Sequence, residues 1–311
     1  MPRQVTTPRE PSRRTLGSML RGVSVVPGAR VNMRYARWPW ACCCVVAAAS
    51  VMLAAQPPQS QRQTPNTRAD WPCGARIDPS YFHLAEATGG HLFLLAPFEI
   101  GDSAPLMLAV DRHPQTIFRL AGSIAPGVHE FDVPIDSSIE SVLFSISVQC
   151  LQNAEVLRPS GVPVAGEGVS DYSNFRAERM VVVNHPEPGM WKVRAGGSGI
   201  AAVMVQARAD VALAAVEFAA AESGSYRRTP LAAVENAVRL RIRGDVRDVQ
   251  AIIVNGAFKT LARLPLTASD EAGTFMGRFS PGADPFRVAV AGTDPQGVPF
   301  QRVDASLFTA R

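Results

Sequence analysis

The sequence has few of the residues from which catalytic and metal sites are built. It holds five histidines and five cysteines in 311 residues, and it contains no C-x-x-C motif. None of the histidines is accompanied by a third ligand at metal spacing: His83, His91, His113, His129 and His185. We therefore expect no structural zinc, no histidine-based metal site and no cofactor.

Local catalytic and metal-binding motifs are missing as well. GGSGI at 196–200 departs from the G-x-S-x-G nucleophile turn at Ile200. DSSIES at 136–141 departs from the D-x-S-x-S metal motif because Glu140 stands at the fifth position. Asp294 lacks the further acidic positions of an EF-hand, so a β-turn is predicted there. Because spacing assembles no nucleophile, base and orienting group, we expect a protein that is not an enzyme.

Basic charge is confined to the N-terminus. Residues 1–55 carry eight arginines against Glu10, a net charge of +7, which leaves −3 for the remainder of a chain whose total is +4. The basic isoelectric point therefore belongs to the leader and predicts no nucleic-acid partner.

That leader has the three parts of an export signal: arginines, an apolar run over 38–55, and small residues before a polar segment. We expect cleavage after Ala55, with an uncleaved membrane anchor as the alternative because the run just reaches spanning length. A start at Met33 instead of Met1 would give a basic region of ordinary length. The prediction is a secreted or extracytoplasmic protein, either periplasmic or on the cell surface.

After the leader the chain keeps only Cys73 and Cys150. An even pair in an exported chain predicts a disulfide, and the alternative is that Cys150 is a buried thiol. Residues 56–70 are rich in Gln and Pro and predict a disordered linker.

Residues 71–114 predict a helix, a strand and a second helix. Asp78 is a candidate N-cap, Pro79 suits the first helical position, and Gly89 or Gly90 would end the first helix. The apolar run HLFLL at 91–95 predicts a buried strand, and Ser103 would open the second helix.

From residue 115 the hydrophobic period changes to two, which predicts a β-sandwich over 115–221. In SVLFSISVQC, 141–150, the apolar residues fall on one face and serines on the other, as in a half-buried antiparallel strand. In VVVNHPEPGMWKVRAGG, 181–197, Pro188 and Gly189 suit the centre of a type II turn. This predicts a hairpin whose Trp191 points into the core.

Beyond a boundary at 222–230, short alternating strands with Gly, Asp or Pro between them predict an immunoglobulin-like β-sandwich over 222–311. The predicted fold class is therefore mainly β: two antiparallel sandwiches, jelly-roll-like and then immunoglobulin-like, preceded by the helix-strand-helix segment. In RLRIR, Arg239, Arg241 and Arg243 share one face and are candidate contacts for an anionic ligand. The alternative is the solvated face of an edge strand.

Three stretches carry a family resemblance. EATGGHLFLL at 86–95 resembles the end of a von Willebrand factor A domain, with its Thr-Gly-Gly junction. RMVVVNHPEPGMWKVRAGGSG at 179–199 and PFRVAVAGTDPQGVPFQRV at 285–303 resemble the region that follows this domain in hemicentin-like secreted proteins.

The resemblance implies a secreted, non-enzymatic structural or adhesion-type module that retains only the C-terminal end of an A domain over 71–114. Because the metal motif is absent, metal-dependent adhesion is not implied. The alternative is a carbohydrate-binding module of a secreted or cell-surface protein. The expected partner is an extracellular protein or polysaccharide, and a membrane contact is expected only through an uncleaved leader.

Overall fold

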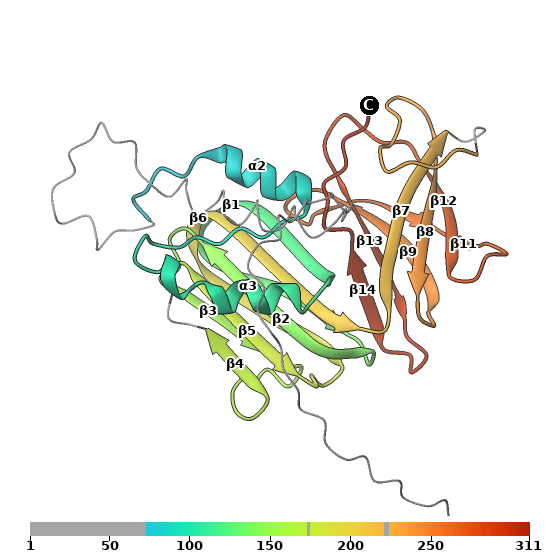
Figure 1. Cartoon of the computed structure of the whole chain (residues 1–311). Coiled ribbons are helices and arrows are strands. Elements are labelled where there is room, and N and C mark those ends of the chain that lie inside the picture. The colour runs from blue at the N-terminus through green and yellow to red at the C-terminus, as the bar shows by residue number, and fades with distance from the viewer. Residues whose placement is uncertain (1–72, 173–174, 221–223) are drawn as a thin grey trace, which may run out of the picture. The chain divides into compact units, whose positions relative to one another are not determined.

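The computed structural model describes residues 73–172, 175–220 and 224–311, which all belong to one compact unit. The predicted leader over 1–55 and linker over 56–70 lie outside the described residues. The described chain is mainly β, with three antiparallel sheets and two short α-helices (Figure 1). The predicted antiparallel β-sandwich class is therefore confirmed.

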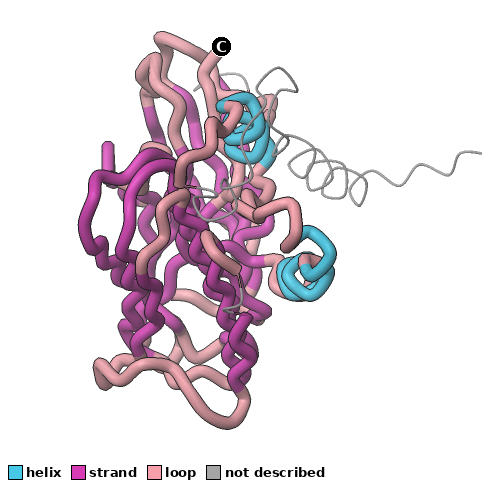
Figure 2. The backbone as a smooth tube through the Cα atoms, turned by 90° about the vertical axis from the view of Figure 1, so that its left-hand side faces the viewer, coloured by secondary structure: helices cyan, strands magenta, loops and turns pink. Residues whose placement is uncertain are grey.

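The N-terminal segment forms two helices joined by an extended stretch. Helix α2 spans Pro79–Thr88, the Asp78 carboxylate accepts from Ser80 N–H at 2.9 Å, and Gly89 ends the helix at φ 73°. A short 3-10 helix, η2, spans Ile100–Asp102, and α3 spans Ala104–Asp111. Both helices thus begin where the capping signals predicted. Figure 2 shows them on the same side of the strands.

The predicted strand at 91–95 is wrong, because this stretch pairs with none of the described strands. Leu92, Phe93, Leu94 and Leu95 are nevertheless buried. They lie against the first sheet, where the Leu92 carbonyl accepts from the Ser147 hydroxyl at 2.9 Å. The apolar run at 91–95 therefore predicted burial correctly, but it did not predict that the stretch would remain outside the sheet.

The first sheet has six strands in the order β1-β6-β2-β5-β4, and β3 also pairs with β6. The strands are β1 Gln115–Ile135, β2 Ile139–Val148, β3 Asn153–Leu157, β4 Val169–Tyr172, β5 Glu178–Asn184 and β6 Gly189–Ala209. Strand β6 pairs with β3 through Lys192–Gly196 and with β2 through Ala201–Ala209, while β1 follows both halves.

This single sheet folds over itself to enclose a core. The β1–β6 register shifts between Ile124 and Gly127, close to Gly197, where an added Cβ would lie 2.4 Å from the Cys150 carbonyl oxygen. Trp191, in the first half of β6, stacks on Phe144 of β2 with ring centroids 5.6 Å apart. The two halves of the sheet therefore supply the two layers of the sandwich.

The predicted hairpin across Pro188 and Gly189 is wrong. Strands β5 and β6 flank the same stretch of sequence, but β2 lies between them in the sheet. Gly189 has φ 144°, far from the value near 80° of a type II turn, and His185 takes up a left-handed conformation at φ 49°. The connection therefore crosses over one strand. Trp191 is still fully buried, in the core of this sheet.

Strand β2 is also buried on both faces, so the prediction of a half-buried strand is wrong. Val142, Phe144 and Ile146 enter the core, as their alternation predicted. Leu143 on the opposite face belongs to a second apolar cluster together with Leu106 of α3. The N-terminal segment therefore covers the face that was expected to meet solvent.

The second module is a sandwich of two four-stranded sheets, β10-β9-β13-β14 and β11-β12-β8-β7. Its strands are β7 Ala212–Ala220, β8 Asn236–Arg243, β9 Arg247–Val254, β10 Thr260–Pro265, β11 Thr267–Ala268, β12 Thr274–Phe279, β13 Arg287–Thr293 and β14 Pro299–Val303. Strand β7 pairs with β8 and places Val216 and Phe218 in this core. The boundary between modules therefore falls at Asp210 and not at 222.

Candidate functional site

The face of the first sheet that meets the N-terminal segment carries a buried polar layer, which we call the covered face. It is formed by Ser141, Ser145 and Ser147 of β2, Glu178 of β5 and His113. The Ser145 hydroxyl donates to Glu178 Oε1 at 2.9 Å, and the Ser147 hydroxyl is close to Oε2 of the same carboxyl. Burial raises the pKa of Glu178 well above its ordinary value, which favours the neutral form of the carboxyl.

On the covered face, one pair approaches a catalytic arrangement. Ser141 Oγ lies 3.0 Å from His113 Nε2, and His113 Nδ1 lies 2.5 Å from the Ala109 carbonyl oxygen. Burial lowers the pKa of His113, which favours a neutral ring that donates from Nδ1 and accepts at Nε2. Sequence reasoning missed this pair, because 28 positions separate its members.

Access and orientation argue against nucleophilic catalysis by this pair. Ser141 and His113 are each only 4% exposed, so a substrate carbonyl has no path to the Ser141 hydroxyl. A backbone carbonyl holds the imidazole where a hydrolase places a carboxylate that stabilises the imidazolium. The Ser141 hydroxyl also lies 2.9 Å from Asn184 Oδ1, so it belongs to a closed network. The pair fastens α3 to the sheet.

A second buried polar cluster surrounds Glu86 of α2. Its carboxylate pairs with Arg119 of β1, at 2.9 Å from Nη2, and with Arg287 of β13. The Arg119 guanidinium also donates to the carbonyls of Ala85, Gly89 and Gly90 near the end of the helix. Burial lowers the pKa of Arg119 to about 10, and the Glu86 carboxylate opposes that shift. One carboxylate thus connects the helix to both modules.

The cavity beside this cluster is too small for an organic ligand. It is lined by Glu86, Arg119, Phe82, Leu92 and Met204 among others, and its volume is about 10 Å³. A volume of this size holds about one water molecule. The cluster is therefore a structural joint.

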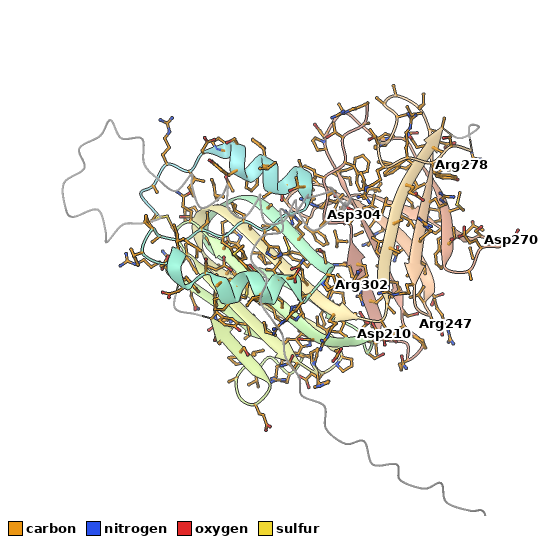
Figure 3. The ribbon with its side chains drawn as sticks, viewed as in Figure 1. Asp210, Arg247, Asp270, Arg278, Arg302 and Asp304 are labelled. Carbon is orange, nitrogen blue, oxygen red and sulfur yellow. A yellow bond between two sulfur atoms is a disulfide. The ribbon has the colours of Figure 1, made fainter. Side chains whose placement is uncertain are left out.

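The turn between β1 and β2 forms a further link to the second module. Arg302 of β14, labelled in Figure 3, is 1% exposed and donates from Nη1 to Asp136 at 2.7 Å. Asp294 accepts from Ser137 N–H at 3.0 Å and from the amides of Gln296 and Val298 in its own turn. The first residues of DSSIES and the Asp294 carboxylate thus have protein groups as partners in the link between the modules. Within the described part of the chain, no three metal-ligating side chains gather.

Cys73 and Cys150 form a disulfide, so the alternative of a buried Cys150 thiol is wrong. The bridge fixes the start of the N-terminal segment to the chain just after β2, where the Gln149 amide also donates to the Ala75 carbonyl at 2.8 Å. Trp191 Nε1 donates to the Glu187 carbonyl at 2.9 Å, which satisfies the indole inside the core. Pro188 and Gly189 lie in the connection before β6.

The predicted arginine row lies on the outer face of the β11-β12-β8-β7 sheet. Arg239 Nη2 lies 2.9 Å from Glu217 of β7, and its guanidinium stacks on Tyr226 at 3.9 Å from the ring centroid. Arg241 Nε approaches the same Glu217 oxygen only at 4.0 Å. Strand β8 lies between β12 and β7, so the alternative of an edge strand is wrong. This exposed row is the candidate functional site of the described chain.

Comparisons with known proteins identify no family. No protein-family model matches the chain, and no curated protein matches it. A lipase of Bacillus licheniformis, BlEst2 in its propeptide form, is 14% identical over 61% of this chain and 40% of its own, with a TM-score of 0.30. A β-D-glucuronidase of Dictyoglomus thermophilum is 11% identical over 57% of this chain and 36% of its own, with a TM-score of 0.20.

This chain therefore spans less than half the length of either structure. Likenesses this weak carry no argument about fold or activity. The resemblance to the hemicentin region stays a prediction. Within residues 73–172, 175–220 and 224–311, no helix combines the length and apolar character needed to span a bilayer.

Proposed function

We propose that this protein is an extracytoplasmic, non-enzymatic module of structural or adhesion type, as its resemblance to the hemicentin region implies. In this role the two β-modules act as one body that presents surfaces at fixed positions. The disulfide between Cys73 and Cys150 supports the location, because such bonds persist mainly in oxidising compartments.

The observation that carries the proposal is the pair of buried ionic joints between the modules. Asp136 and Arg302 are both at most 1% exposed, and the Glu86 joint is nearly as well buried. A buried charge whose partner is removed costs several kcal/mol, because the remaining ion has lost water and gained nothing. Both joints therefore depend on the two modules keeping this arrangement, because loss of one partner leaves an uncompensated charge at a buried position.

Differential scanning calorimetry of the chain without its leader tests this arrangement. We expect a single transition for the wild-type protein, and for Asp136→Asn a destabilisation of roughly 3–5 kcal/mol with separation into two transitions. Arg302 would keep its charge in that variant but lose the carboxylate. The matched control is Arg208→Gln, which breaks the exposed pair with Glu140 and should change stability by less than about 1 kcal/mol. Two transitions in the wild type would contradict the proposal.

The non-enzymatic part of the proposal has its own test at Ser141. A fluorophosphonate probe modifies serines that a neighbouring base activates, so labelling followed by peptide mapping reports on the Ser141–His113 pair. We expect no modification of Ser141 in the folded protein, with Ser141→Ala giving the same background. Stoichiometric labelling that Ser141→Ala abolishes would show that the protein is an enzyme.

A carbohydrate-binding role is the second candidate, and the arginine row on β8 favours it. Arg241 is half-exposed, and the carboxylate with which it pairs, that of Glu217, lies 4.0 Å away. A row of this kind can bind an anionic polymer without any catalytic group.

A further inference from the structure

The arginine face has a linear geometry. We define it as Arg239, Arg241 and Arg243 of β8 together with Arg278 of β12. Alternate residues of a strand project to the same side about 6.6–6.8 Å apart, so the three β8 guanidiniums span about 13 Å. Arg278 stands opposite Ala237 and therefore extends the row by one position on the neighbouring strand. Figure 3 labels Arg278 on β12.

Acidic side chains on this face offset only part of its positive charge. Glu217 is shared by Arg239 and Arg241, at 2.9 Å and 4.0 Å. Arg278 pairs with Glu235 at 2.8 Å, and both side chains are largely exposed. Arg243 forms no ion pair within 4.0 Å with any described residue. Two carboxylates thus pair with three of these four arginines, which leaves Arg241 with only a 4.0 Å contact and Arg243 with no ion pair among the described residues.

Fold stability does not explain this surplus. Charged residues protect the open edge of a sheet from pairing with another sheet, but β8 has a hydrogen-bonded neighbour on each side. Like charges at alternate positions of one strand repel each other. On β7, the residues opposite Arg241 and Arg243 are Ala215 and Ala212, so no large side chain shields the two guanidiniums there. A row that costs stability and remains accessible has the properties of a binding surface.

We infer that the arginine face binds an acidic polysaccharide, with the sulfate or carboxylate groups of an extended chain meeting Arg241 and Arg243. A linear polymer with anions at regular intervals matches a straight row of cations better than a single small anion does. Arg239 already stacks on Tyr226, which leaves that ring engaged and unavailable as a platform for nucleobases. The inference rests on the extracytoplasmic location in the proposed function and is independent of the joints between modules.

Chromatography on immobilised heparin tests the inference. The chain without its leader should be retained, and Arg241→Gln/Arg243→Gln should elute at lower salt. If each arginine displaces about one counterion, the slope of log Kd against log salt concentration should fall by about two. Arg208→Gln/Arg263→Gln is the control of equal charge, because both of its positions are exposed and lie off the arginine face. Its elution should match that of the wild type.

Other anionic probes decide the class of ligand. Desulfated heparin, a dT oligonucleotide and phosphatidylserine vesicles should each bind more weakly than heparin at equal ionic strength. Retention unchanged in Arg241→Gln/Arg243→Gln, or reduced equally in the control, would overturn the site. Tighter binding of the oligonucleotide or the vesicles would overturn the polysaccharide. None of these results depends on the calorimetric transition, so failure here and failure of the two-module arrangement are distinguishable.

Discussion

At the scale of single residues, the polar groups inside this protein are held in two different ways. Glu86 and Asp136 are buried, and each forms a salt bridge with an arginine. Glu178 is buried, no other described residue forms an ion pair with it, and its partners there are serine hydroxyls and a backbone amide. Neutralisation is the cheaper solution for such a carboxyl, because isolating the charge would cost far more than keeping a proton.

Glu178 should therefore make stability depend on pH. Its folded pKa is raised, so its contribution is complete below the unfolded pKa and is lost as pH rises through the folded pKa. In Glu178→Gln the amide stays neutral at every pH and can still bond Ser145. We expect the stability of the variant relative to wild type to rise with pH, by at most tenfold in the unfolding equilibrium constant per pH unit. Urea unfolding at pH 4.5, 6 and 8 measures this, and a difference independent of pH would contradict it.

Residue patterns in the sequence identified what local chemistry determines. The Asp78 cap, the Pro79 start and the Gly89 end are all encoded within a dozen positions, and the structure has them as predicted. The ionic joints depend instead on partners far apart, such as Glu86 and Arg287 at a separation of 201. No spacing rule connects such residues, so the joints could not be predicted from one sequence.

At the scale of secondary structure elements, periodicity predicted strands but not their neighbours. Alternation correctly placed Trp191 toward the core, yet it could not show that β2 would lie between β5 and β6. Short β-runs next to each other in sequence usually pair, and Pro-Gly between them favours a tight turn. Here the turn is replaced by a longer connection through His185, in which the peptide N–H of His185 donates to the Glu140 carbonyl of β2.

The boundary between modules was misplaced for a similar reason. Residues 200–220 are rich in apolar residues on both sides of Asp210, so both parts were predicted to belong to the module over 115–221. The break at Asp210 changes the sheet to which the chain belongs, and only tertiary pairing shows this. Strand β10 is a short strand at the edge of its sheet that ends at Pro265 and has exposed Leu261 and Arg263.

At the scale of the whole molecule, the N-terminal segment connects everything else. It covers one face of the first sheet through α3 and the 91–96 stretch, and its α2 carries Glu86 to the joint with the second module. The Leu307 amide also donates to the Glu86 carbonyl at 3.2 Å. Its start is held by the disulfide, by a hydrogen bond from Gln149 to the Ala75 carbonyl and by the packing of Ile77 against an apolar cluster. Stability of the whole should therefore depend on Cys73 and Cys150.

Removing the bridge in Cys73→Ser/Cys150→Ser should lower the free energy of unfolding. The bridge joins positions 77 residues apart, and closing a loop of that length stabilises by about 4–5 kcal/mol in the chain-entropy model. Guanidinium unfolding of the variant measures the loss, and the wild type in excess reductant is the matched control because it breaks the same bond without a substitution. The variant and the wild type in reductant should unfold at the same guanidinium concentration, which should be lower than that of the oxidised wild type. If the variant instead unfolds at the same guanidinium concentration as the oxidised wild type, apolar and polar contacts alone hold the N-terminal segment on the first sheet.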